Sequence, residues 1–184
     1  MFILYAVAIG LILGVLLGGS VSRLGDIQFR WWPLMLVGFG MQVVLFQDAV
    51  AAQVGSLGAP LYVVSTLLVV IAVLRNVALP GIPLVALGAA CNLAAILANG
   101  GFMPASPGAM AALGKSAPQI YSNSAVLAHP ALEPLTDIFA LPSWLPFNNI
   151  FSIGDLILAA GVVVVVVSAM RSDRRPEEAG PRVD

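Results

Sequence analysis

Residues 152–171 read SIGDLILAAGVVVVVVSAMR and are the clearest indication of the fold class. The only charged residues of this stretch are Asp155, near the start, and Arg171, the last residue. An α-helix needs about 20 consecutive apolar residues to cross the hydrocarbon core of a bilayer. The stretch therefore predicts a membrane-crossing helix that begins near Ser152 and has an arginine at its far boundary.

Four further apolar stretches precede this one. They are residues 1–18, residues 31–47, residues 60–74 and a stretch that follows the Leu79–Pro83 turn and ends near Ala98. Hydrophobic residues make up 60% of the chain and charged residues 9%, and the mean hydropathy is +1.00. A water-soluble domain of 184 residues could not bury the apolar surface of so many hydrophobic side chains. We therefore expect an all-α integral membrane protein with five transmembrane helices, which form a single domain over residues 1–171, followed by a disordered tail over residues 172–184.

The arginines set an orientation for these helices. All seven fall in gaps that an alternating path places on one side of the membrane: Arg23, Arg30, Arg75, Arg171, Arg174, Arg175 and Arg182. That side also carries five acids, for a net charge of +2 (7 − 5), whereas the other side carries Lys115 and four acids, for −3 (1 − 4). Because loops rich in basic residues stay in the cytoplasm, we expect an extracytoplasmic N-terminus and a cytoplasmic C-terminus.

The same composition narrows the choice of partners. Basic residues scattered over short loops, without interleaved aromatic residues, do not fit a nucleic-acid interface. Cys91 is the only cysteine, so neither an intrachain disulfide nor a cysteine metal cluster can form. We expect membrane lipids as neighbours, no nucleic-acid partner and no cofactor.

Small and polar residues indicate how the predicted helices pack. Gly10, Gly14 and Gly18 share one helix face and permit the close approach of another helix, most simply one of the same chain. The short Leu79–Pro83 turn makes the third and fourth helices an antiparallel hairpin. For Asn92, a bond to a neighbouring helix is the first interpretation and contact with a ligand is the second.

The segment from Asn99 to Phe151, between the fourth and fifth helices, is expected to fold as an outer cap. It holds seven of the 13 prolines, and its many aromatic and aliphatic side chains are costly to leave in water. Its first residues, Asn-Gly-Gly-Phe-Met-Pro at 99–104, predict a sharp turn on leaving the fourth helix. Ser106 followed by Pro107 then predicts the start of a short helix, which should end at Gly114.

Three potential ligands in the cap are spaced four residues apart: His129, Glu133 and Asp137. On a continuous helix they would share a face, but Pro134 removes a backbone donor and clashes one turn back. A second strong nitrogen or sulfur ligand is also missing. We therefore expect no metal site here.

Asp155 is open to two interpretations. It lies three residues after Ser152, in the position of a capping box, where it would bond to the start of the helix and benefit from the helix dipole. A carboxylate at the edge of an apolar span can instead face a ligand or a water-filled cavity. The structural role is the first choice, although capping boxes normally use the longer Glu or Gln.

Three motifs together resemble a known family. They are Asn-Gly-Gly-Phe-Met-Pro at 99–104, Thr-Asp-Ile-Phe-Ala-Leu-Pro at 136–142 and Phe-Ser-Ile-Gly-Asp-Leu at 151–156. The combination is similar to a family of small bacterial integral membrane proteins catalogued as a domain of unknown function, and the likeness extends to the opening helix. It implies a bacterial plasma-membrane protein and names no substrate. The signature positions that it implies are Asn99, Gly100, Gly101, Met103, Pro104, Asp137, Ser152, Gly154 and Asp155.

Three classes of function follow from these observations. The first is a non-enzymatic module whose outer cap binds a small apolar ligand or a partner membrane subunit, and we favour it because the motifs gather at the outer ends of the last two helices. The second is a small transporter, or a transport subunit, that uses Asp155. The third is an enzyme acting on a lipid at the outer leaflet, with Asp137 or Asp155 as acid or base and His129 assisting, but the spacing of these groups is not diagnostic of catalysis.

Overall fold

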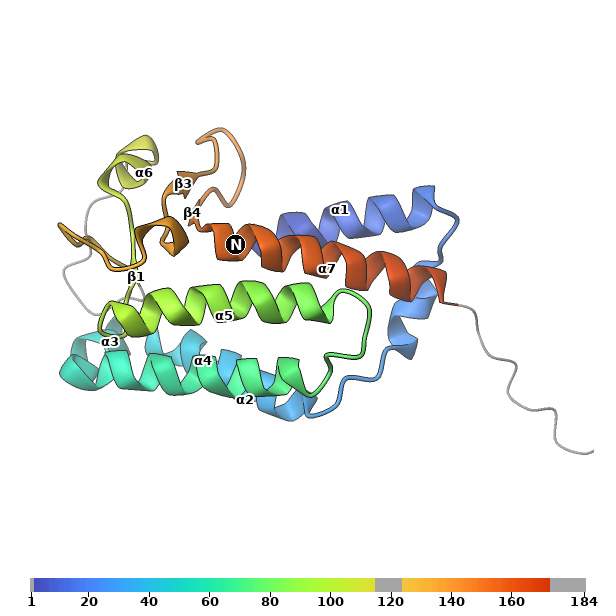
Figure 1. Ribbon diagram of the computed structural model, residues 1–184, viewed down its shortest axis with the longest axis horizontal. Coiled ribbons are helices and arrows are strands. Elements are labelled where there is room, and N and C mark those ends of the chain that lie inside the picture. Colours follow the sequence, from blue (N-terminus) through green and yellow to red (C-terminus); the bar gives the residue numbers. More distant parts are fainter. Residues whose placement is uncertain (1, 115–123, 173–184) are drawn as a thin grey trace, which may run out of the picture.

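The computed structural model describes residues 2–114 and 124–172, and these are mostly helical (Figure 1). The α-helices are α1 (Phe2–Leu16), α2 (Trp32–Leu45), α3 (Asp48–Val54), α4 (Gly58–Leu74), α5 (Ile82–Ala98), α6 (Pro107–Ala112) and α7 (Ile153–Arg171). Three 3-10 helices accompany them: η1 (Val21–Asp26), η2 (Gly55–Leu57) and η3 (Glu133–Leu135). The strands have two residues each: β1 (Met103–Pro104), β2 (Ser124–Ala125), β3 (Phe139–Ala140) and β4 (Ile150–Phe151).

Five of the helices lie side by side as an open row. The main contacts run from α1 to α7, from α7 to α5, from α5 to α4 and from α4 to α2. Helices α1 and α2 are therefore the two edges of the row, although they are neighbours in sequence. Each predicted apolar stretch is confirmed as a helix, and the predicted hairpin is confirmed as α4 and α5.

The helices differ in length. By length and composition, the continuous stretch Asp48–Leu74 and helix α7 could cross a membrane, whereas α1, α2 and α5 are shorter apolar helices of 15, 14 and 17 residues. The longer stretch includes α3, which lies between the apolar stretches of residues 31–47 and 60–74. Ala51 of α3 is buried, so contacts with the rest of the fold stabilise this short helix.

Glycines bring α5 and α7 into backbone contact. A Cβ on Gly88 of α5 would lie 2.4 Å from the carbonyl oxygen of Gly154, and one on Gly161 of α7 would lie 2.6 Å from the amide of Val85. The glycines predicted to permit close helix packing were instead those of the first helix. Gly10 and Gly14 do pack against α7 of the same chain, whereas Gly18 has open space around it.

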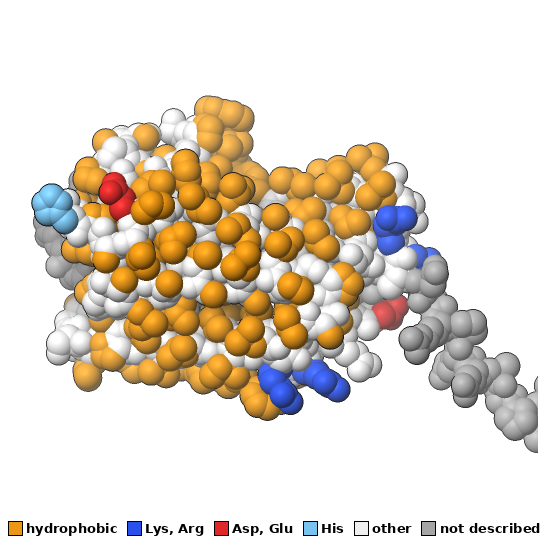
Figure 2. Space-filling model, in the orientation of Figure 1, with side chains coloured by type: hydrophobic (Ala, Val, Ile, Leu, Met, Phe, Trp, Pro, Cys, Tyr) orange, Lys and Arg blue, Asp and Glu red, His pale blue; other side chains and the backbone are white. Residues whose placement is uncertain are grey.

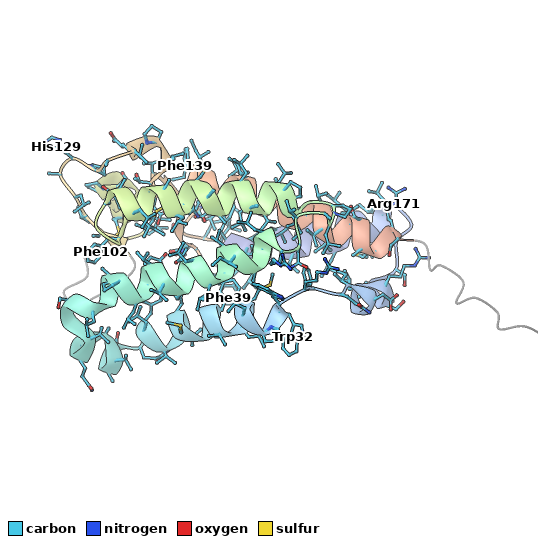
Figure 3. The ribbon with its side chains drawn as sticks, turned by 60° about the horizontal axis from the view of Figure 1, so that its bottom comes forward. Trp32, Phe39, Phe102, His129, Phe139 and Arg171 are labelled. Carbon is cyan, nitrogen blue, oxygen red and sulfur yellow. The ribbon has the colours of Figure 1, made fainter. Side chains whose placement is uncertain are left out.

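Charge divides the row into two ends. The four described arginines, Arg23, Arg30, Arg75 and Arg171, lie in or beside η1, the start of α2 and the ends of α4 and α7, which we call the arginine end (Figure 2). The opposite end carries α3, the start of α7 and residues 99–114 and 124–151, and we call it the cap end. Phe102, His129 and Phe139 lie there, away from Arg171 (Figure 3).

The arginine end is held together by Asn76, which is 4% exposed. Its side-chain amide donates to the carbonyl oxygens of Ala72 and Arg30, and its oxygen accepts from the amide of Arg30 at 2.7 Å. The guanidinium of Arg75 stacks over the ring of Trp31 at 4.7 Å from the ring centre. These contacts join the loop before α2 to the end of α4.

Candidate functional site

The three motif segments meet at the cap end. Strand β1 pairs in parallel with β2 on one side, and Ala105 bridges to Asp137 on the other. The backbone amide of Asp137 donates to the carbonyl oxygen of Pro104, and the backbone amide of Ser106 donates to the carbonyl oxygen of Asp137. Both distances are 2.9 Å. The predicted structured cap is therefore confirmed for the described residues, but its short strands make the expectation of an all-α fold incomplete.

The strand pair that follows leads directly into α7. Strand β3 pairs antiparallel with β4, which places Phe139 opposite Phe151, and their rings stack with centres 5.4 Å apart. The ring of Phe151 also stacks on Phe2 of α1, with centres 4.5 Å apart. The next residue, Ser152, begins the last helix, so the cap is tied to both α1 and α7.

Asn99 fixes the cap over the end of α5. Its side-chain amide donates to the carbonyl oxygen of Ala131, and its oxygen accepts from the amide of the same residue, both at 2.8 Å. Gly100 and Gly101 follow with φ of 71° and 90°, a conformation that glycine adopts without strain. A Cβ on Gly101 would also lie 2.7 Å from the Cβ of Ala59. The predicted sharp turn is confirmed, and these positions serve backbone geometry.

Met103 and Pro104 belong to the core of the cap end. Met103 is 4% exposed and packs with Leu45, Ala95 and Ile96, which lie on α2 and α5. Pro104 is fully buried. Both side chains therefore anchor strand β1, whose backbone then holds Asp137.

Asn92, Ser152 and Asp155 form a closed hydrogen-bond network between α5 and α7. The hydroxyl of Ser152 accepts from the amide of Asp155 at 3.0 Å, and the amide of Ser152 donates to Oδ2 of Asp155 at 3.1 Å. This is the predicted capping box, which is confirmed. The amide of Asn92 donates to Oδ1 of Asp155 at 2.7 Å, and the hydroxyl of Ser152 donates to Oδ1 of Asn92 at 2.9 Å. Both carboxylate oxygens of Asp155 thus have protein donors.

Gly154 permits this network. A Cβ at position 154 would lie 1.9 Å from Oδ1 of Asn92, well inside van der Waals contact. Any side chain there would push Asn92 away from the start of α7. The motif Ser-Ile-Gly-Asp is therefore explained by capping and by the docking of Asn92.

The carboxylate of Asp137 is the one signature group without such an explanation. Its backbone holds the cap together, yet its side chain is only 7% exposed, and no described residue donates a hydrogen bond to the carboxylate. Burial, and secondarily the charge of Asp155, raise the pKa of Asp137 from 3.8 to about 7. A buried carboxylate without a donor is costly, so such groups are often functional.

The other candidate ligands do not join Asp137. Residues 133–135 form a 3-10 turn, so His129 and Glu133 do not share a helix face with it. Within residues 2–114 and 124–172, no group of three His, Cys, Asp or Glu side chains is placed to hold a metal ion. The helix predicted after Ser106 is confirmed as α6, with the Ser106 hydroxyl accepting from the amide of Ala109. Lys115 lies outside the described residues.

The comparison with known families agrees with the motifs. Residues 26–167 match the Family of unknown function (DUF5317). The chain belongs to this family. The matched region runs from η1 to α7 and contains all three DUF5317 motif segments, but it leaves out α1, so the likeness does not extend to the opening helix as the motifs had suggested. No curated protein and no solved structure matches the chain.

One feature of this DUF5317 chain was missed by the sequence analysis. The structure has an apolar groove at the cap end between α2, α3 and the start of α4. The sequence did not indicate a binding site here, because the lining residues are apolar and such residues are common in any apolar helix.

Proposed function

We propose that this DUF5317 chain is a five-span bacterial plasma-membrane protein whose outer cap binds a ligand or a partner subunit, and that it is not an enzyme. The N-terminus and the cap lie outside, and the arginine end and the C-terminus lie in the cytoplasm. The ligand group enters beside Asp137. The membrane placement and the site rest on different observations.

The apolar surface of the row supports the membrane placement. Leu16 and Ile12 of α1 are 74% and 61% exposed, and Val43 and Leu36 of α2 are 63% and 60% exposed. Hydrophobic side chains cover the visible face along the length of the helices (Figure 2). An apolar surface of this extent is unfavourable in water and suits hydrocarbon.

The ends of the row support both the crossing and its direction. The described arginines share one end. Trp31 stacks with Arg75 and Trp32 begins α2 at this end, where indole rings suit the headgroup region. Helix α1 is about 22 Å long at 1.5 Å per residue, which is less than the roughly 30 Å of an average hydrocarbon core. Local thinning of the bilayer accommodates such a helix at modest cost.

The ligand site is inferred from one observation, the buried carboxylate of Asp137. Its carboxylate is buried where the three motif segments meet, and no described residue satisfies it. The chemistry that complements it is an amine, a hydroxyl or another hydrogen-bond donor on an otherwise apolar molecule or on a partner side chain. Asp155 is a weaker candidate for a transport relay, because both of its oxygens already accept hydrogen bonds.

The test compares the protein with two neutral variants of its acids. The wild type, Asp137→Asn and Glu133→Gln are purified in mild detergent, and native mass spectrometry detects retained small molecules or subunits. Asp137→Asn preserves shape and removes the charge, whereas Glu133→Gln removes an exposed charge of the same end. We expect a species retained by the wild type and by Glu133→Gln and lost from Asp137→Asn. Equal retention by all three proteins, or none by the wild type, contradicts the proposal.

A further inference from the structure

The groove at the cap end has one wall on α2. Gly40 and Val44 are four residues apart on this helix and so are Met41 and Leu45, so the wall consists of two adjacent rows along the helix axis. From Val44 to Gly40 the groove follows α2 for one turn, about 6 Å. It therefore runs parallel to the helices of the row.

The opposite walls come from α3 and α4. Val50 and Val54, again four residues apart, line it from α3, and Leu61 lines it from the first turn of α4. The groove has a volume of about 320 Å³, at the lower end of the range for small-ligand sites. All of the lining side chains are apolar, so the groove suits a hydrocarbon segment and offers nothing to a polar ligand.

The groove is open on its outer side. A Cβ on Gly40 would meet nothing within 4 Å. Val44 lines the groove and is still 57% exposed, and α2 is an edge helix of the row. An occupant can therefore enter sideways, from the surroundings of the helices, which under the proposed function are lipid acyl chains.

The first charged residue beyond the cap-end limit of the α2 wall is Asp48. It is exposed at the start of α3, three residues after Leu45. The four described arginines all lie at the far end of the row. An acidic end without a described cation disfavours an anionic headgroup and complements a headgroup that carries an ammonium group.

We propose that this groove holds the upper part of one acyl chain of an amine-bearing phospholipid, with its ammonium group beside Asp48. The inference rests on the membrane placement given under the proposed function and is independent of Asp137. The wall along α2 has the direction of an acyl chain in a leaflet. Asp48 follows the cap-end limit of that wall in the chain, which suits a headgroup there.

Photo-crosslinking in vesicles tests the groove directly. The full chain is placed in phosphatidylcholine vesicles that contain either phosphatidylethanolamine or phosphatidylglycerol with a photoreactive group on an upper acyl carbon, and the labelled peptides are mapped by mass spectrometry. A leucine at position 40 would occupy the groove. Because a Cβ there meets no atom within 4 Å, the Gly40→Leu protein should still fold. Val43→Leu adds bulk to the same helix outside the groove and is the matched control.

Each variant has its own expected result. Phosphatidylethanolamine should label residues 40–54 of the wild type about threefold more than phosphatidylglycerol, the size expected of one exposed ion pair. Gly40→Leu should lose this labelling, Val43→Leu should keep it, and Asp48→Asn should make the two lipids equal. Undiminished labelling of Gly40→Leu, or equal labelling of the wild type by both lipids, overturns the proposal.

Two further measurements separate this proposal from the preceding one. Alkaline carbonate extraction of the same vesicles tests whether the chain is integral. If carbonate removes it, the membrane placement fails and the lipid site fails with it. If the chain stays and the groove is unlabelled, only the lipid site fails. Asp137→Asn should be labelled like the wild type, because its carboxylate does not line the groove.

Discussion

The side-chain amide of Asn92 on α5 donates a 2.7 Å hydrogen bond to the carboxylate of Asp155 on α7, 63 residues away. The oxygen of the same amide accepts from the hydroxyl of Ser152, so Asn92 completes a network that begins as a local helix cap. The contact lies where the cap joins the row of helices. It therefore couples the start of α7 to the helix that precedes the cap.

Removing this amide should destabilise the protein. Asn92→Ala leaves Oδ1 of Asp155 without its donor and the hydroxyl of Ser152 without its acceptor, and Ser152 is fully buried. We expect a loss of about 1–3 kcal/mol in the free energy of unfolding, measured by denaturant titration in mild detergent. Gln47→Ala is the control, because Gln47 is exposed just after α2 and its side chain bonds only to the carbonyl oxygen of Val43 in the last turn of that helix. A loss no larger than that of the control would show that the network contributes little.

Two glycine substitutions should have effects of opposite sign. Gly154→Ala places a methyl group 1.9 Å from the oxygen of Asn92, so α5 and α7 must separate, at a cost of about 1–3 kcal/mol. Gly40 lies in the interior of the α2 sequence, and a methyl group there would meet no other atom within 4 Å. Gly40→Ala should therefore stabilise the protein by about 0.5–1 kcal/mol through helix propensity. Thermal unfolding monitored by circular dichroism compares them. Similar shifts of the midpoint for both variants would disprove the close approach at Gly154.

Much of the local structure followed from short sequence patterns. The apolar length of residues 152–171 located α7, and the spacing of Ser152 and Asp155 located its cap. Ser106 followed by Pro107 located α6 in the same way. These features depend on neighbours in sequence, which is why sequence reasoning found them.

Apart from the hairpin of α4 and α5, the arrangement of the helices did not follow from the sequence. Gly81, the residue before α5, and Gly88 are seven residues apart, as are Gly154 and Gly161 on α7, but neither pattern indicates which helix packs against it. The burial of Asp137 depends on its pairing with Pro104, more than thirty residues earlier in the chain. The sequence could therefore name Asp137 as a candidate without showing that its carboxylate lacks a described partner.

Protonation of Asp137 should make stability depend on pH. Its pKa is raised from 3.8 to about 7, so between these values the folded protein holds a proton that the unfolded chain has released. Stability should therefore fall as the pH rises from about 4 to about 7 and should then level off. Asp137→Asn should remove this slope.

The measurement is the unfolding midpoint of the wild type and Asp137→Asn in mild detergent across that pH range. Asp155→Asn is an unsuitable control because it also breaks the helix cap, so Asp48→Asn serves instead. Parallel curves for the wild type and Asp137→Asn would mean that the carboxylate is hydrated or paired in solution.

Both proposals depend on the cap end and the arginine end lying on opposite sides of the plasma membrane, and cysteine labelling of intact cells tests this most directly. In a chain with Cys91 replaced, single cysteines are placed at exposed positions: Ser56 and Ser143 at the cap end, and Ser22 and Ser172 at the arginine end. A membrane-impermeant maleimide should label the first pair in intact cells and the second pair only after permeabilisation. Labelling of all four positions from outside, or protection of Ser56 and Ser143, would contradict the account.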